Sequence, residues 1–139
     1  MESSSGEQGT RGASISLKRH IEWIDTDAAG RYHYATALRL IEDAETSLLA
    51  QLGIVDIFTR LPRAHLEADF KRMVNFRDTI EVNLEVVSVG NSSVSYEFEL
   101  LHEGELCVGG KLVGVLVDPD GRPTRWPDEH RQLLMPDGV

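Results

Sequence analysis

Apolar residues recur at helical spacing over His33–Leu52, the longest periodic stretch of the chain. At about 100° of rotation per residue they form one broad stripe. The stripe consists of Ala37, Leu38, Ile41, Ala44, Leu48, Leu49 and Leu52. This pattern predicts a helix that is covered over most of its surface, and Gly53 follows it where a left-handed cap is favoured. Two carboxylates depart from the pattern, because Glu45 projects from within the stripe and Glu42 lies at its edge.

Alternation of apolar and polar residues, which is typical of strands with one buried face, marks the rest of the chain. It predicts strands over Ile15–Ile24, Ala64–Phe70, Ile80–Val86, Val94–Leu100 and Leu106–Val117. Arg19 interrupts the apolar face of the first strand. Turn residues separate the later strands at Gly90-Asn91, Glu103-Gly104 and Asp118–Gly121. Pro127–Leu134 is expected to form a short helix, with proline at the first helical position.

The predicted order is one strand, a long helix and then a run of consecutive strands. Strands that follow one another through short turns form an antiparallel sheet, and a broadly apolar helix must then cover one face of it. The fold class is therefore α+β, with a flexible tail at residues 1–13 and one domain at 14–139. Such a pair of layers leaves a strand edge or a sheet face uncovered, which favours dimerisation.

Composition and charge narrow the function classes. The 139 residues fit a single domain, and a net charge of −9 disfavours binding to nucleic acid. Cys107 is the single cysteine, so an internal disulfide is excluded. The histidines have no metal-ligand spacing, and no phosphate-binding loop, dinucleotide motif or serine nucleophile elbow is present, so we expect no metal and no cofactor. No stretch is long enough to span a membrane and residues 1–12 have no apolar core, so we expect a cytoplasmic protein.

The candidate chemistry lies in Glu22–Tyr34, EWIDTDAAGRYHY, which leads into the long helix. The first amides of a helix have no acceptor within the helix and carry positive potential, so they can stabilise a developing oxyanion. An aspartate a few residues earlier can act as a general base or nucleophile toward a bound carbonyl. The alternative is that Asp25 and Asp27 only shape a turn and cap the helix.

The stretch Asp-x-Asp-x-x-Gly, followed by an aromatic/histidine pair, the long helix and the strands, resembles the hotdog-fold acyl-CoA thioesterases of the 4-hydroxybenzoyl-CoA thioesterase type. The resemblance extends over Ile15–Leu134 and includes the segments ADFKR at 68–72, FRDTIEV at 76–82, VGNSS at 89–93 and GRP at 121–123. It implies an antiparallel sheet wrapped around one central helix. It also implies hydrolysis of an acyl-CoA thioester.

Matched by position, the resemblance implies that Asp27 is the catalytic carboxylate. The amide that holds the thioester oxygen falls on Tyr34, with His33 beside it, and the acidic residue of the family's helix falls on Glu42. A second branch of the fold uses a helix carboxylate instead, a role that Glu42 or Glu45 could fill. Family members differ from this chain around the entrance of the acyl pocket, where it has Arg31, Thr36 and Ala37, so Thr36 is a candidate substrate-binding residue.

Two further features bear on substrate binding. A carboxylate such as Glu45 must be paired, protonated or facing water in a cleft, and Arg39, His20 or a partner subunit are candidate ion-pair partners. Lys71 and Arg72, with Arg77 close by, form a local basic cluster that suits the phosphates of coenzyme A. The alternative for this cluster is a solvated strand end.

The functional prediction is therefore an acyl-CoA thioesterase that forms homodimers and, through them, homotetramers. Asp27, His33, Tyr34 and Glu42 are the predicted catalytic residues, and Thr36, Glu45, Lys71 and Arg72 the predicted substrate-binding residues. One alternative is dehydration or hydration of an acyl thioester by His33 and Glu42. Another is a protein that binds acyl thioesters without turnover.

Overall fold

The computed structural model describes residues 12–25 and 34–136. Its strands are β1 (Ser14–His20), β2 (Arg63–Phe70), β3 (Thr79–Val89), β4 (Ser93–His102) and β5 (Glu105–Val115). Its α-helices are α1 (Tyr34–Gln51) and α2 (Asp128–Leu134), and two 3-10 helices are η1 (Trp23–Asp25) and η2 (Val55–Arg60). The predicted α-helices and strands are thus confirmed, with boundaries that shift by a few residues.

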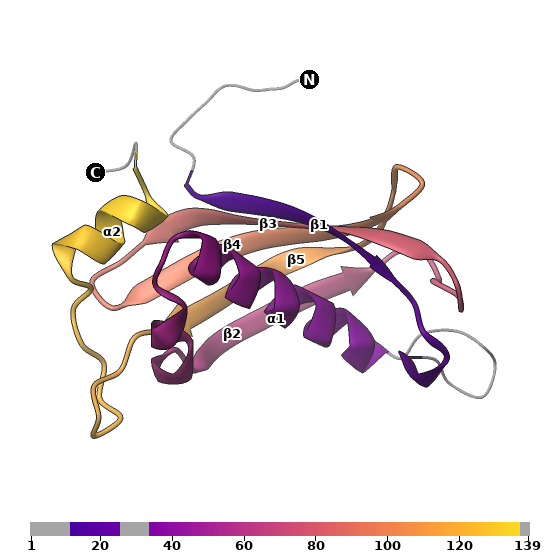
Figure 1. Cartoon of the computed structure of the whole chain (residues 1–139). Coiled ribbons are helices and arrows are strands. Elements are labelled where there is room, and N and C mark those ends of the chain that lie inside the picture. Colours follow the sequence, from indigo (N-terminus) through magenta and orange to yellow (C-terminus); the bar gives the residue numbers. More distant parts are fainter. Residues whose placement is uncertain (1–11, 26–33, 137–139) are drawn as a thin grey trace.

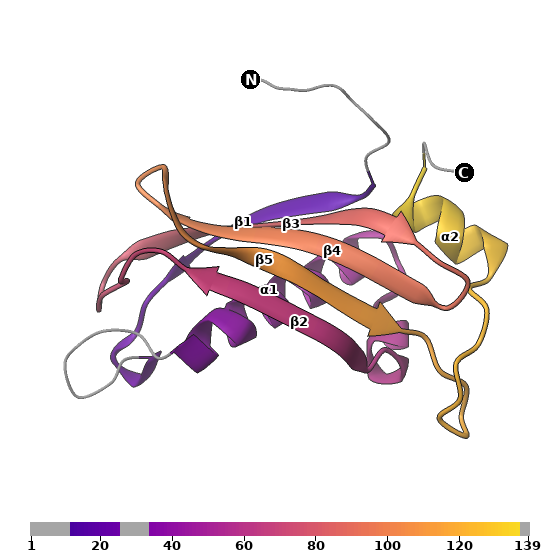
Figure 2. The same cartoon turned by 180° about the vertical axis from the view of Figure 1, so that it is seen from behind.

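The strands form one five-stranded antiparallel sheet in the order β1-β3-β4-β5-β2. The strands β3, β4 and β5 follow one another through short turns and form the centre. The chain passes through α1 between β1 and β2, and these two strands occupy opposite edges of the sheet (Figure 1). Seen from behind, α1 lies across one face of the sheet only (Figure 2). This arrangement confirms the predicted α+β class.

The core lies between α1 and the sheet. The residues of α1 that face the sheet are almost completely buried, as are the alternating residues of β3 and β4 opposite them. They are Ala37, Ile41, Ala44, Leu48 and Leu49 from α1, Ile80, Val82, Leu84 and Val86 from β3, and Val94, Tyr96, Phe98 and Leu100 from β4. The period-two and period-3.6 patterns of the sequence therefore meet in a single apolar layer.

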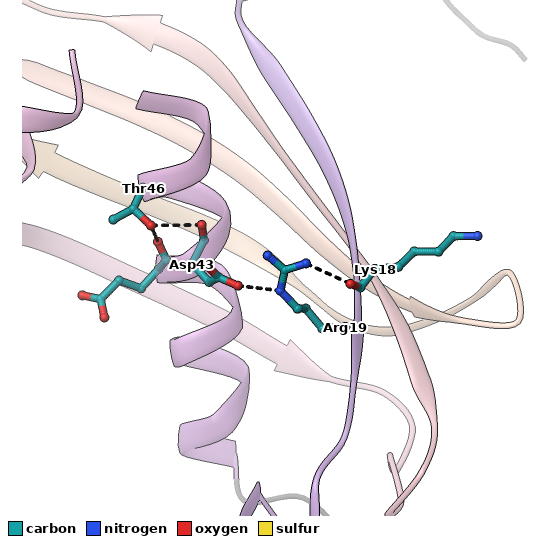
Figure 3. Close-up of polar contacts among 5 residues, drawn as sticks. Lys18, Arg19, Asp43 and Thr46 are labelled. Carbon is teal, nitrogen blue, oxygen red and sulfur yellow. Dashed lines mark hydrogen bonds and ion pairs between the residues drawn. The ribbon is translucent and has the colours of Figure 1, made fainter. Parts of the chain in front are cut away.

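Ion pairs hold α1 to both edge strands. On the β1 side, Arg19 Nε donates to Asp43 Oδ2 at 2.7 Å (Figure 3). On the β2 side, Arg63 Nη2 lies 2.7 Å from Glu45 Oε1. Arg19, which interrupts the apolar pattern of the first strand, is thus accommodated because the helix supplies an opposite charge.

The first strand is shorter than predicted. It ends at His20 rather than Ile24, because the chain turns into η1. The amide of Asp25 donates to the carbonyl of Glu22 at 2.9 Å, and Asp25 Oδ2 accepts the Glu22 amide at 2.8 Å. Side-chain hydrogen bonds of this kind compete with extended backbone structure.

The two ends of the described chain meet at β3. The Gly12 amide donates to the carbonyl of Val86, and the Ala13 amide to that of Leu134 in α2. Trp126, which is buried, donates through Nε1 to the carbonyl of Ser93 at 2.9 Å.

Residues 1–11 and 137–139 lie outside the described residues, so the division into a tail at 1–13 and a domain at 14–139 stays a prediction.

Candidate active site

The junction between η1 and α1 is fixed by the side chain and carbonyl of Asp25. Its buried carboxylate forms an ion pair with Arg39 of α1 and accepts the Glu22 amide. Its carbonyl accepts a hydrogen bond from the Thr36 hydroxyl at 3.0 Å. These contacts of Asp25 with Thr36 and Arg39 tie η1 to the first turns of α1. Asp25 therefore shapes the turn of η1, whereas the capping role of the alternative and its claim for Asp27 stay predictions.

Two of the predicted catalytic residues, Asp27 and His33, lie outside the described residues. Tyr34 is the first residue of α1, and its side chain is 73% exposed. Its ring makes an edge-to-face contact with Phe70, with the ring centroids 6.3 Å apart. This contact brings the end of β2 to the N-terminal end of α1.

The predicted coenzyme A cluster begins directly after Phe70. The amides of Lys71 and Arg72 both donate to the carbonyl of Cys107, at 2.7 and 3.3 Å. The Arg72 guanidinium also lies 3.2 Å from Glu105, so part of its charge is compensated. The two basic residues therefore follow a strand end that contacts the start of α1.

A cavity of about 220 Å³ lies between α1 and the β2 edge of the sheet. Apolar side chains make up most of its wall, from Leu38 and Ile41 of α1, Leu66 of β2 and Leu112 of β5. The charged residues Arg39, Glu42 and Arg63 complete it. Glu42, a predicted catalytic residue, has a side chain that is 54% exposed and lies 3.6 Å from Arg63.

Arg63 faces α1 because β2 begins with an irregularity. The register with β5 shifts between Arg63 and His65, which is the signature of a β-bulge. Side chains three positions apart in a regular strand point to opposite faces, yet Arg63 and Leu66 line the same cavity. The Arg63 guanidinium also lies over the ring of Phe58 in η2, 5.3 Å from its centroid.

Glu45 does not line this cavity, but it contacts Arg63, which does, and its side chain is 0% exposed. Burial raises the pKa of its carboxyl, and this effect outweighs the opposing influence of Tyr96 and Arg63. Burial, together with the neighbouring Glu45 charge, also raises the pKa of Tyr96 well above its ordinary value. Neither the carboxylate nor the hydroxyl has a well-aligned hydrogen-bond partner among the described residues. Glu45 and Tyr96 are thus two neighbouring polar groups inside the core, and Arg63 is the cation beside them.

A larger hollow, of about 510 Å³, lies on the sheet among residues of β2, β3, β4 and β5. Its wall is mainly polar and includes Glu67, Glu85, Glu97, Glu99 and Lys111. None of the predicted site residues that the structure describes lines it. We therefore place the candidate site on the α1 face.

The structure gathers the described site residues into two neighbouring groups. Tyr34 and Thr36 lie at the start of α1, near the strand end that leads to Lys71 and Arg72. Glu42 lines the cavity, and Glu45 contacts Arg63 in its wall. Sequence reasoning missed Arg63 and Tyr96, because one depends on a bulge and the other fits the apolar pattern of its strand.

The sequence matches the thioesterase-like superfamily over residues 21–134, which is most of the chain and includes the whole junction between η1 and α1. The chain belongs to this superfamily. Its curated relatives include a 1,4-dihydroxy-2-naphthoyl-CoA hydrolase of Synechococcus elongatus, which is 30% identical over 117 residues and matches across 79% of this chain and 86% of the relative. A second relative of the same name, from Prochlorococcus marinus, is 28% identical over 118 residues, 76% of each chain.

Solved structures agree with the family membership. A thioesterase of Thermus thermophilus, complexed with coenzyme A and Zn, superimposes with a TM-score of 0.80 at 23% identity and covers 86% of this chain and 90% of its own. The PA5185 protein of Pseudomonas aeruginosa has a TM-score of 0.77 at 30% identity, with 86% and 88% covered. The predicted hotdog fold and the predicted thioesterase family are both confirmed.

Within the described residues, no helix is long and apolar enough to cross a membrane. The same part of the chain contains no group of three or more histidine, cysteine, aspartate or glutamate side chains that could hold a metal ion. The roles predicted for individual residues of this superfamily member stay predictions.

Proposed function

We propose that the protein is an acyl-CoA thioesterase that releases a free acid and coenzyme A, with Asp27 as its catalytic carboxylate. The observation that carries the proposal is the family match over residues 21–134. Curated relatives named as CoA hydrolases support the reaction class, and the predicted class of thioester hydrolase is confirmed at that level.

The anchoring of Asp25 supports the role of Asp27. Asp25 is bound to Arg39 and Thr36, both in the first turns of α1. Two residues of extended chain span at most about 7 Å, which limits how far Asp27 can lie from Asp25. This limit supports the proposal that Asp27 acts on a carbonyl held at the N-terminal amides of α1.

The proposed reaction uses the helix start as an oxyanion hole. The thioester oxygen accepts hydrogen bonds from amides near Tyr34, while His33 orients the thioester. Asp27 either removes a proton from water, whose oxygen attacks the carbonyl carbon, or attacks that carbon itself to give an anhydride that water then cleaves. In both cases the C–S bond breaks and the thiolate of coenzyme A leaves and is protonated.

The remaining assignments follow from position. Lys71 and Arg72 are proposed to bind phosphates of coenzyme A, because their strand end contacts the start of α1 through Phe70. The cavity beside Glu42 is proposed to receive the acyl group. The curated relatives are named for a dihydroxynaphthoyl thioester, so we propose an aromatic acyl-CoA as the substrate class. A cytoplasmic location is proposed from the sequence.

The test is a thiol-release assay over aliphatic and aromatic acyl-CoAs. Asp27→Asn and Asp27→Ala are expected to lower kcat by at least about 100-fold, the usual size of a general-base or nucleophile effect. Asp56→Asn, the same change at an exposed residue of η2, is the matched control and should leave the rate unchanged. Unchanged hydrolysis by both Asp27 variants would exclude Asp27 as the catalyst.

The same assay distinguishes the alternative functions. A 3-hydroxyacyl-CoA that yields an enoyl product without thiol release would favour dehydration by His33 and Glu42. Saturable binding of acyl-CoAs with no turnover would favour a binding protein.

We also propose that the protein forms homodimers, and tetramers from them, through the β2 edge. Among the described strands, β2 pairs only with β5. Its Leu66 and Phe70 side chains are exposed, as are Leu38 and Tyr34 of α1 beside it. Light scattering should therefore give two or four times the chain mass of 15.5 kDa. A monomer at micromolar concentration would contradict the assembly.

A further inference from the structure

We propose that Arg63, together with Glu42, determines specificity by recognising a hydroxyl group on the acyl portion of the substrate. Glu45 is the positioning residue that holds Arg63 in place. The inference rests on the proposed function, because it assigns the acyl group to the cavity between α1 and β2.

The size and wall of the cavity favour a compact, mainly apolar group. Its volume of about 220 Å³ is below the roughly 300–1,000 Å³ of pockets for whole drug-sized ligands. Four leucine and isoleucine side chains line it, so an aromatic ring fits better than the charged coenzyme. A pocket of this kind usually fixes orientation through a small number of polar groups.

Arg63 and Glu42 supply such a polar pair. Arg63 Nη2 lies 3.6 Å from Glu42 Oε2, which is longer than the roughly 2.7–3.2 Å of a direct hydrogen bond. A single oxygen atom can lie within hydrogen-bond distance of both. A guanidinium only donates hydrogen bonds and a carboxylate only accepts them, whereas a hydroxyl does both.

Other substituents satisfy only one member of this pair. An anionic group would be attracted by Arg63 but repelled by Glu42. A cationic group would be attracted by Glu42 but repelled by Arg63. A hydrocarbon would displace water from both charged groups without replacing the hydrogen bonds, which is costly. A hydroxyl group is therefore the substituent that this end of the cavity suits best.

Arg63 is held before any ligand arrives. Glu45 Oε1 lies 2.7 Å away, the Phe58 ring lies under the guanidinium, and the bulge at the start of β2 turns the side chain toward α1. Glu45 is fully buried and does not line the cavity, so it acts on a ligand through Arg63. A donor fixed in this way loses little freedom when it binds.

The test compares 1-hydroxy-2-naphthoyl-CoA with 2-naphthoyl-CoA, which differ only by the hydroxyl group. The wild-type protein should prefer the hydroxylated substrate by at least about 10-fold in kcat/KM, since polar sites reject ligands that leave them unpaired. Arg63→Met, which keeps side-chain length and removes the donors, should bring this ratio close to one. Glu45→Gln should lower the ratio to an intermediate value. Arg122→Met, which changes an exposed residue, is the control and should keep the wild-type ratio.

Arg63→Met leaves the buried Glu45 carboxylate without its ion-pair partner, and the variant will not fold if this cost is too high. A double variant keeps the test decisive in that case. Arg63→Met combined with Glu45→Met removes both charges, and such apolar replacements of buried ion pairs are often tolerated. It should also bring the ratio close to one. A ratio below about 3 in the wild type, or a wild-type ratio in the double variant, would overturn the inference.

A binding measurement separates this inference from the proposed function. Calorimetry with 1-hydroxy-2-naphthoate and 2-naphthoate requires no hydrolysis, and the hydroxylated acid should bind at least about 10-fold more tightly to the wild type. Hydrolysis of both thioesters without a hydroxyl preference would refute the role of Arg63 and leave the thioesterase intact. Absence of thiol release with every substrate would refute the proposed function, and the binding ratio would then decide the role of Arg63.

Discussion

Glu45 is a residue whose ionisation the fold opposes. Its carboxylate is fully buried between α1 and the sheet, and burial raises its pKa above the ordinary value of 4.5 in spite of Arg63. Between the ordinary and the raised pKa, the folded protein binds more protons than the unfolded chain. The contribution of Glu45 to stability therefore falls as the pH rises through that window.

Glu45→Gln removes this titration. The free energy of unfolding of the variant, minus that of the wild type, should increase as the pH rises from about 4.5 and level off above the raised pKa. Urea denaturation at a series of pH values measures the difference. Glu129→Gln, at an exposed residue of α2, is the control and should show no such trend. A difference that decreases with pH would mean that the attraction of Arg63 outweighs the cost of burial.

The sequence predicted that the Glu45 carboxylate needs a partner, a proton or access to water, but it did not predict which partner it has. A carboxylate within the apolar stripe has to be paired, protonated or in a cleft, and Glu45 is paired. The prediction that Arg39 or His20 forms the ion pair with Glu45 was wrong. Arg39 binds Asp25, and His20 Nδ1 lies 2.8 Å from the hydroxyl of Thr79. Arg63 could not be recognised, because its inward direction depends on a bulge that the sequence pattern does not show.

At the scale of elements, the contact between β2 and β5 depends on Gly110. A Cβ atom there would lie 2.0 Å from the carbonyl oxygen of Glu67 and 2.9 Å from Cα of Ala68, both in the backbone of β2. Gly110→Ala must displace β2 and should destabilise the protein by about 1–3 kcal/mol, as is usual for overpacking. Urea denaturation checks this expectation.

Gly109→Ala is the matched control on the same strand. Its Cβ would lie 3.6 Å from the side chain of Leu106 and 4.0 Å from the carbonyl oxygen of Phe98, which are ordinary contacts. Gly109→Ala should lower the free energy of unfolding clearly less than Gly110→Ala does. Equal effects of the two variants would show that close approach of the β2 backbone is not the cause.

The hairpin between β4 and β5 contains a residue in a left-handed conformation. Glu103 has φ 51° and precedes Gly104 with φ 83°, while His102 pairs with Glu105. Asn-Gly suits such a two-residue turn, so Glu103→Asn should stabilise the protein by about 0.5–1 kcal/mol. Thermal unfolding measures the gain. Glu105→Asn, in the adjoining strand, should give none, and a gain there as well would argue against the turn as the source.

The regular elements were predictable because each depends on residues close in sequence. The periodicity of α1 and the alternation in β3 and β4 correspond to the buried faces of the structure. The 3-10 helices η1 and η2 were not predicted. Side-chain hydrogen bonds of Asp25 accompany η1, and η2 encloses a single buried residue, Ile57, so neither has a periodic signal.

At the scale of the whole molecule, negative charge gathers in the large hollow on the sheet. Lys111 lies there between Glu67 and Glu97, which are its direct neighbours across β2 and β4. Lys111→Met removes this cation and should lower the thermal midpoint by about 2 °C at low salt. The decrease should shrink at high salt, because exposed charges are screened. Lys71→Met, outside the hollow, is the control, and a salt-independent decrease would point to packing instead.

The bulge that begins β2 affects how the specificity of this protein can be traced among homologues. In a regular strand the residue two positions before Leu66 points to the same face as Leu66, so a homologue without the extra residue would present its guanidinium from the position that holds Ala64 here. The cavity of that homologue would keep its donor, although the residue aligned with Arg63 would differ. A gap-free alignment would therefore score the guanidinium as lost, and a search for enzymes that accept hydroxylated aromatic acids has to allow a single-residue gap at the bulge.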